Sequence, residues 1–393
     1  MKYLKEFENH SLYSAFTDTD EFIKPNVSIC VRENDVHYNP LTDVDRYLTF
    51  TAQEDTTFTF TPKNGNVVSF STDGGNTWTE GNSVEVGNRG TVMWRGSTSP
   101  LAGDGVGSFG SSGNFVVHGN VMSLLYGDGF RGQKSLTGKD YAFYGLFTGN
   151  DRLISAERLC LPATDLSECC YDSMFSYCTN LVSAPKLPST ELSEKCYQSM
   201  FLGCSSLVEA PELPAETLSD WCYADMFSGC TSLSSAPELP ATELADYCYY
   251  RMFEGCTGII MPPELPVTEL ADWCYAGMFY GCTSLTRAPE LPATTLTKRC
   301  YSYMLGRCTS LITAPDLIAT DLAAECYYFM FEGSSNLNYI KAMFTTAPGK
   351  GYTSHWVDGV ASIGTFVKNS AATWALTGIN GIPSGWVVET ESE

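Results

Sequence analysis

Apolar side chains return at a fixed spacing through the middle of the chain. A motif close to Cys-Tyr-x-x-Met-Phe-x-Gly-Cys begins every 26 residues, at Cys170, Cys196, Cys222, Cys248, Cys274, Cys300 and Cys326. One unit of this length cannot bury its own apolar face, so neighbouring units have to stack. The spacing predicts a solenoid of about eight units, with degenerate first and last copies acting as caps.

Each unit is predicted to begin with a short helix. Between Leu218 and Cys230 the apolar positions lie at offsets of 0, 4, 5, 8, 9 and 12, which places them on one face of a helix. Threonines before this segment are expected to cap the helix, and glycines near its end to stop it in a left-handed conformation. The predicted caps are Thr190, Thr217, Thr242 and Thr268, and the predicted stops are Gly203, Gly229, Gly255 and Gly281.

A short strand is predicted after each helix. It carries the pattern Thr-Ser-Leu-x-x-Ala-Pro-Glu-Leu-Pro, in which the first apolar residue points inward and the proline at Pro211 and its equivalents ends the strand. Strands of successive units are expected to stack in parallel. The inward residues are Leu207, Leu233, Ile259, Leu285 and Leu311. The fold class predicted is α+β, a leucine-rich-repeat-type solenoid preceded by a small all-β domain.

The regions on either side of the repeats differ from them. Around Phe58 and Phe60 apolar residues alternate with threonine, and short valine-containing runs are separated by Gly, Asn and Ser clusters, which is typical of a small β-sandwich. The predicted organisation is an N-terminal attachment or oligomerisation segment, a β-sandwich-like domain, the solenoid and a C-terminal cap. Their bounds are 1–48, 49–140, 141–345 and 346–393.

Composition and charge exclude several classes of function. The formal net charge of -22 argues against nucleic acid as a partner, because binding phosphates requires clustered Lys and Arg. No run of about 20 apolar residues predicts a membrane span. The first residues carry acids where a signal peptide has its apolar stretch, so export by the usual route is not expected.

The sixteen cysteines fall almost wholly inside the repeats, most of them in two positions per unit. In a helix, Cys222 and Cys230 are about 12 Å apart, too far for a disulfide within the unit. Free buried thiols are the favoured interpretation. Bridging between units and metal binding are the alternatives, because equivalent cysteines form two columns.

No residue pattern predicts catalysis, a cofactor or a metal centre. The four histidines are scattered, without a zinc or Ser-His-Asp spacing. A candidate partner-binding surface comes instead from variable aromatic positions and from an acidic column. The alternatives are a structural layer for the aromatic rings, and a solvated edge or a weak calcium site for the acids. The residues are Trp221, Tyr247, Tyr250, Trp273, Tyr280 and Tyr303, with Glu212, Glu238, Glu264 and Glu290.

Two resemblances suggest what such a chain does. The repeat pattern Phe-x-Gly-Cys-Thr-Ser-Leu, followed by a strand and a proline, resembles the BspA-like leucine-rich repeats of bacterial surface and adhesion proteins. The leader Lys-Tyr-Leu-Lys-Glu-Phe, the segment 26–40 and the ending Gly-Thr-Phe-Val-Lys-Asn-Ser-Ala-Ala-Thr-Trp resemble virion proteins of phages and prophages of gut Bacteroidales.

The resemblance implies a non-enzymatic tail fibre or adhesin component of a virion, released by host lysis. Its solenoid is expected to bind a host-surface glycan or protein, and its N-terminal region to bind other virion proteins. Fibres are often homotrimers, although no long heptad run is present. The alternative is an adhesin on the bacterial cell surface, or a protein-interaction scaffold, with no virion role.

Overall fold

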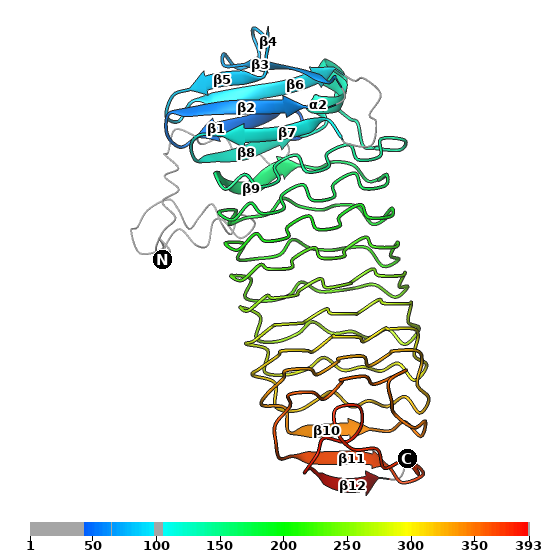
Figure 1. Cartoon of the computed structure of the whole chain (residues 1–393). Coiled ribbons are helices and arrows are strands. Elements are labelled where there is room, and N and C mark those ends of the chain that lie inside the picture. The colour runs from blue at the N-terminus through cyan, green and yellow to red at the C-terminus, as the bar shows by residue number, and fades with distance from the viewer. Residues whose placement is uncertain (1–42, 64, 98–104, 392–393) are drawn as a thin grey trace, which may run out of the picture.

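The computed structural model describes residues 43–63, 65–97 and 105–391. Strands and turns dominate the described part of the chain, and helices are few and short. A small sheet domain lies at one end of an elongated stack of repeat units, and a three-stranded sheet lies at the other end (Figure 1). Residues 1–42, most of the predicted attachment segment, lie outside the described residues.

The small all-β domain is confirmed and consists of two sheets. One sheet has the order β4-β3-β6-β1-β8-β9 and the other the order β5-β2-β7. Pairing is antiparallel throughout, except between β8 and β9. The strands are β1 (Leu48–Ala52), β2 (Thr56–Pro62), β3 (Val67–Ser71), β4 (Thr79–Glu80), β5 (Ser83–Val86), β6 (Thr91–Ser97), β7 (Gly107–Ser111), β8 (Phe115–Asn120) and β9 (Leu153–Cys160). Two short helical turns, α2 (Ser123–Tyr126) and η4 (Gly127–Gly129), follow β8.

Aromatic side chains fill the core of this domain. The alternation predicted for β2 directs Phe58 and Phe60 inward. The ring of Phe50 lies 5.3 Å from Phe58 and 4.8 Å from Phe109 between ring centroids, so it joins strands of both sheets. Trp94 completes the cluster and is fully buried.

The sheet domain and the repeats share one continuous hydrophobic core. β8 pairs in parallel with β9, which belongs to the first repeat unit. The backbone N–H groups of Val106 and Phe109 donate to the carbonyls of Ala142 and Leu146 in that unit, at 3.2 and 2.8 Å. The sheet domain therefore covers the N-terminal end of the stack directly, without a linker.

The predicted helix is wrong, because residues 218–230 form a run of overlapping turns. Every second N–H bonds to the carbonyl three residues earlier, as Cys222 does to Ser219 at 3.2 Å. The N–H groups between them bond to the next unit, as Tyr223 does to Cys248 at 3.1 Å. In an α-helix all of these N–H groups would bond four residues back, and no donor would remain to join the units.

A left-handed residue at every fourth position produces the run of turns. In one unit Trp221, Asp225 and Gly229 have φ angles of 59°, 53° and 74°. The backbone repeats every four residues. Two pairs of side chains therefore point inward together: Cys222 with Tyr223, and Met226 with Phe227. The offsets of 4, 5, 8 and 9 therefore reflect a period of four, whereas a helical face would also use offsets of 3 and 7.

The threonines predicted as helix caps have no helix to cap. The hydroxyl of Thr217 lies 3.4 Å from a carboxylate oxygen of Glu243 in the next unit. Thr190, Thr242 and Thr268 lie one position earlier in their own units than Thr217 does, and they too precede a run of turns. The glycines predicted as left-handed do adopt that conformation. The φ angles of Gly203, Gly229, Gly255 and Gly281 are 71°, 74°, 67° and 74°.

The inward leucines of the predicted strands are buried, but the strands themselves are reduced. Leu207 and its equivalents are fully buried, while the central units are joined on this side by isolated parallel bridges such as Ser183↔Glu209. Proline in each unit removes a backbone donor, so a continuous ladder cannot form there. Where the prolines are lost, at the C-terminal end, a parallel sheet of β10 (Tyr339–Ala342), β11 (Thr365–Asn369) and β12 (Val387–Glu391) does form.

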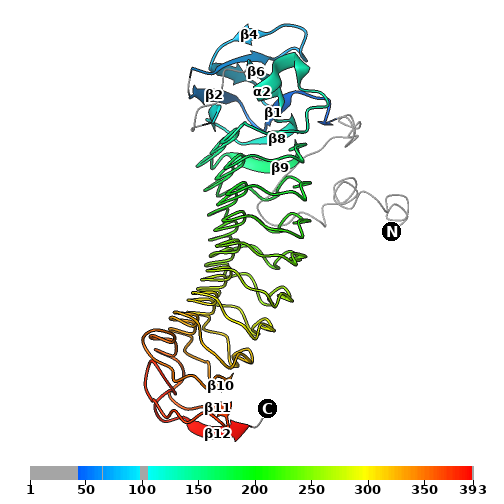
Figure 2. The ribbon, with the colours of Figure 1, turned by 90° about the vertical axis from the view of Figure 1, so that its right-hand side faces the viewer.

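The repeat units lie one above another along the stack (Figure 2), and identical side chains stack along its core from unit to unit. The rings of Tyr197 and Tyr223 lie 6.0 Å apart and 5° from parallel, and those of Phe201 and Phe227 lie 5.6 Å apart and 2° from parallel. Each of these rings thus has a matching ring on either side, so both of its faces are buried. The run of turns also continues into the residues assigned to the C-terminal cap, where Phe331 donates its backbone N–H to Trp356 at 2.9 Å.

The fifteen cysteines in the described part of the chain are free thiols. Those in the second column donate to a phenylalanine carbonyl of the preceding unit, as Cys230 does to Phe201 at 3.2 Å. In the last such position Ser334 donates to Leu305 at 2.7 Å, so a hydroxyl performs the same function. The second column therefore requires a small side chain that donates a hydrogen bond.

We expect Cys230→Ser to change the free energy of unfolding by less than about 1 kcal/mol, because the hydroxyl keeps the bond to Phe201. Cys230→Val adds a methyl group to a closely packed site and loses the donor, so a loss of about 1–3 kcal/mol is expected. Urea denaturation of both variants measures the difference. A larger loss for the serine variant than for the valine variant would show that the hydrogen bond to the Phe201 carbonyl is not what this position requires.

Candidate interaction surface

Three aromatic side chains form a stacked column on the outside of the turns. We call Trp221, Tyr247 and Trp273, which precede the Cys-Tyr pair in successive units, the aromatic ladder. Trp221 and Tyr247 lie 4.0 Å apart and 7° from parallel, and Tyr247 and Trp273 lie 5.2 Å apart and 19° from parallel. Tyr250 lies edge-on beside all three, at 5.7, 5.8 and 6.1 Å. These four predicted site residues are thus brought together, half-buried, by adjacent units.

The aromatic ladder occupies backbone positions that favour glycine. Trp221, Tyr247 and Trp273 have φ angles of 59°, 58° and 60°. A left-handed conformation costs a residue with a Cβ roughly 1–2 kcal/mol, and glycine avoids that cost. Four of the central units place glycine at the left-handed position eight residues later, but none places it at the ladder position. Large side chains are therefore kept here in spite of the backbone.

A column of carboxylates runs beside the aromatic ladder. Asp220 accepts a hydrogen bond from the backbone N–H of Asp246 at 3.0 Å, and Asp246 accepts one from Asp272 at 2.9 Å. Asp272 in turn accepts from the backbone N–H of Lys298 at 3.0 Å. One oxygen of each carboxylate is thereby fixed by the next unit, which orients the other oxygen.

Arg299 continues the aromatic ladder in the next unit. Its guanidinium lies 4.3 Å from the ring centroid of Trp273 and forms an ion pair with Glu325. Neither Arg299 nor the aspartates belong to the aromatic positions or to the glutamate column, so these two sequence patterns do not identify them. Reading the same position in every unit, 26 residues apart, would have found them.

Tyr280 and Tyr303 belong to a second group, in later units. Their ring centroids are 6.1 Å apart, and Tyr303 stacks on Phe329 at 5.1 Å. Phe329 stacks on His355 at 4.8 Å, so this column continues beyond the last cysteine-bearing unit. The six predicted aromatic residues therefore form two groups rather than one surface.

The predicted glutamates lie apart from the turns, on the proline-containing segment of each unit. Glu212, Glu238, Glu264 and Glu290 are exposed. The nearest cation to Glu290 is Arg287, at 3.8 Å. Among the residues that the structure describes, no three His, Cys, Asp or Glu side chains are grouped to hold a metal ion. The arrangement gives no geometric support to the calcium alternative.

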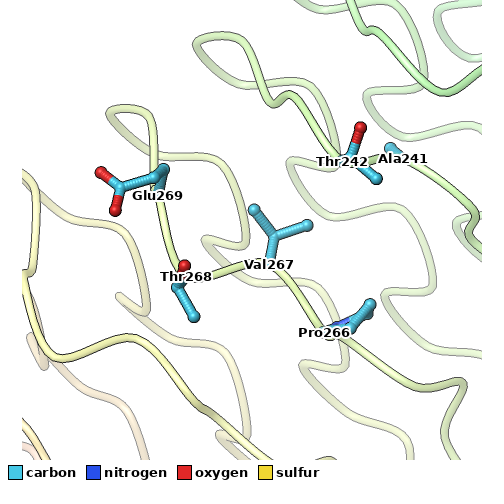
Figure 3. Close-up of a pocket in the computed structure, with 6 residues that line it drawn as sticks. All are labelled: Ala241, Thr242, Pro266, Val267, Thr268 and Glu269. Carbon is cyan, nitrogen blue, oxygen red and sulfur yellow. The ribbon is translucent and has the colours of Figure 1, made fainter.

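Hollows on the surface are shallow. One of about 210 Å³ lies between two units and is lined by Ala241, Thr242, Pro266, Val267, Thr268 and Glu269 (Figure 3). Residues 294–296 and 321–323, on the same side of two later units, line a second one of about 170 Å³. Small-molecule sites usually measure about 300–1,000 Å³. These two hollows are smaller and recur with the repeat, which marks them as gaps between neighbouring units.

Reactive groups in the core are held in unreactive states. Burial raises the pKa of the Cys222 and Cys230 thiols well above the usual range, so neither forms a thiolate at neutral pH. In the sheet domain His118 lies 3.1 Å from the hydroxyl of Thr51 and 3.8 Å from Asp43. The longer distance exceeds that of a hydrogen bond, so these three groups do not form a working alcohol–imidazole–carboxylate relay.

Asp225 makes the stability of the stack depend on pH. Burial, partly offset by Arg251, raises the pKa of this carboxyl to about 6. The folded chain then holds the proton more tightly than the unfolded chain, so stability falls as the pH rises from about 4 to about 6 and stays low above that. Asp225→Asn is expected to add about 2 kcal/mol to the free energy of unfolding at pH 7.5.

The same variant is expected to leave stability almost unchanged at pH 4, where the native carboxyl is already protonated in the fold. Asparagine also tolerates the left-handed backbone at this position, so the substitution adds little strain. Urea denaturation at the two pH values provides the measurement. An equal gain at both would show that burial of the charge is not the cause.

In the part of the chain that the structure describes, no helix is both long enough and apolar enough to cross a membrane. Compared with protein families, with curated proteins and with solved structures, the chain matches none of them.

Proposed function

We propose that this chain is a non-enzymatic recognition protein, whose repeats form a rigid solenoid of leucine-rich-repeat type. The observation that supports this most is the contrast between inward and outward positions of the turns. The inward pairs are nearly identical in every unit, while the ladder position holds, in order, Lys195, Trp221, Tyr247, Trp273, Arg299 and Glu325. A constant scaffold with variable, partly exposed side chains is what a binding surface requires.

Rigidity supports the same proposal. In each unit alternate N–H groups of the turns bond to the next unit, and buried rings stack above and below. A surface held in this way loses little conformational entropy when a partner binds. The shallow hollows and the protonated thiols give no support to an enzymatic role.

The partner that we propose is a glycan or protein on a host cell, with the chain acting as a fibre or adhesin component of a phage virion. This part rests on the resemblance to virion proteins of Bacteroidales phages. The N-terminal region would bind other virion proteins, and lysis would release the particle. A cell-surface adhesin without a virion role is the alternative, which the same resemblance to BspA-like repeats supports.

Binding of the purified chain to whole Bacteroidales cells tests recognition, with fluorescence per cell as the readout. We expect saturable binding to some strains, reduced by Trp273→Ala and unchanged by Glu238→Gln. Absence of binding to every strain in a broad panel would contradict the recognition role. Labelling of phage particles with an antibody to the chain tests the virion role separately, and unlabelled particles would favour the cell-surface alternative.

A further inference from the structure

We propose that the aromatic ladder and the column Asp220, Asp246 and Asp272 bind an extended, uncharged polysaccharide that runs along the stack. This inference rests on the proposed recognition function and names its ligand class.

Apart from the face of Trp221 that is turned away from Tyr247, the faces of the ladder rings are covered by a neighbouring side chain. Trp221, Tyr247 and Trp273 stack on one another, and the outer face of Trp273 is covered by the guanidinium of Arg299 at 4.3 Å. A ligand therefore meets mainly ring edges rather than ring faces. Apolar partners that bind by filling a deep, dry pocket have no such pocket at this place.

The ring edges carry polar groups without partners. The indole N–H groups of Trp221 and Trp273 and the hydroxyls of Tyr247 and Tyr250 form no hydrogen bond with any described residue. The three aspartates each fix one oxygen through the backbone of the next unit and leave the other unpaired within the described chain. Donors and acceptors therefore lie side by side along the stack, which suits a ligand rich in hydroxyl groups.

The repeat distance favours a glycan over an extended peptide. Units joined by parallel backbone bonds lie about 4.8 Å apart, and an extended peptide repeats its side chains on one face about every 6.6 Å. The peptide would fall out of step with the column within a few units. A sugar residue in an extended chain advances by nearly the spacing of neighbouring units, so each unit meets one sugar.

Charge restricts the class further. The carboxylate column lies on a chain with a formal net charge of -22, which would repel sulfated, sialylated or uronic-acid polymers. The ligand class is thus a linear polysaccharide of neutral hexoses or N-acetylated hexosamines.

Affinity electrophoresis tests the inference in gels that contain a soluble neutral polymer, namely hydroxyethyl cellulose (a β-1,4-glucan), a soluble β-1,3-glucan, mannan or glycol chitin. Alginate is the anionic comparison. We expect retardation by at least one neutral polymer and none by alginate. The double variant Asp246→Asn, Tyr247→Phe keeps the stacking and the backbone bond, and is expected to bind about tenfold more weakly. Tyr177→Phe changes an exposed tyrosine outside the ladder and serves as the matched control.

Equal binding by the double variant and the native chain would overturn the assignment of this site. Retardation by alginate alone, or by no polymer, would overturn the ligand class. Periodate treatment of host cells separates this inference from the proposed function. If binding to cells survives periodate but not protease, the partner is a protein and the glycan inference fails while recognition stands. If the native chain binds no cells at all, recognition itself fails.

Discussion

Replacing Phe227 by alanine is expected to lower the free energy of unfolding by about 3–5 kcal/mol. Its ring is fully buried and lies between Phe201 at 5.6 Å and Phe253 at 5.8 Å. Alanine would leave a cavity that neither neighbour can fill, because each is held by its own stacking and backbone bonds. Each unit contacts mainly its neighbours, so the loss would also weaken the coupling between the two halves of the stack.

Urea denaturation measures the loss, and hydrogen exchange measures the coupling. Phe227→Leu is the matched control, because Leu305 occupies the same position in a later unit and is fully buried. A cost of about 1 kcal/mol is expected for leucine. Similar costs for alanine and leucine would mean that the ring column is loosely packed, contrary to the stacked geometry.

Inserting one alanine between Asp225 and Met226 is expected to cost about 4 kcal/mol or more. The turns repeat every four residues, with left-handed positions at Trp221, Asp225 and Gly229. One extra residue shifts Met226 and Phe227 out of their inward positions and misaligns the N–H groups that bond to the next unit. Circular dichroism and urea denaturation, together with limited proteolysis, are expected to show loss of the stack around this unit.

The proline-containing side of the units offers the matched control. The first unit has two more residues between Leu153 and Leu161 than later units have between the equivalent leucines. In the first unit this longer segment forms strand β9. Inserting Gly-Ser between Ser234 and Ser235 is therefore expected to cost less than about 1.5 kcal/mol. If both insertions are tolerated equally, the period of four does not determine the register.

Much of the fold can be predicted from the sequence, because the buried positions hold nearly the same apolar residue types in every unit. The spacing of 26 residues, the inward leucines and the glycines at left-handed positions are all readable from the chain. The run of turns could not be predicted, because offsets of 4 and 8 suit both a helix and a run of turns. Deciding between them depends on left-handed backbone at residues such as Trp221 and Asp225, where side-chain type gives no warning.

The candidate surface was only partly predictable. The aromatic residues can be identified from the sequence, but their division into two groups cannot, because ring stacking depends on the orientation of each side chain relative to the adjacent unit. Nor does the sequence show that ring faces are covered, as Arg299 covers Trp273. The glutamate column was visible because four successive units share the same residue type at this position.

The hydrogen bonds that join the turns of neighbouring units all point one way, from the N–H groups of one unit to the carbonyls of the next unit towards the C-terminus. Peptide dipoles of about 3.5 D each are therefore aligned along the long axis and add, as they do in a helix. On the proline-containing side, bonds such as that from Val208 to Val182 run in the opposite sense but are fewer. The stack thus has a partial negative charge at the end next to the sheet domain and a partial positive charge at the other, and its two ends are electrically unlike.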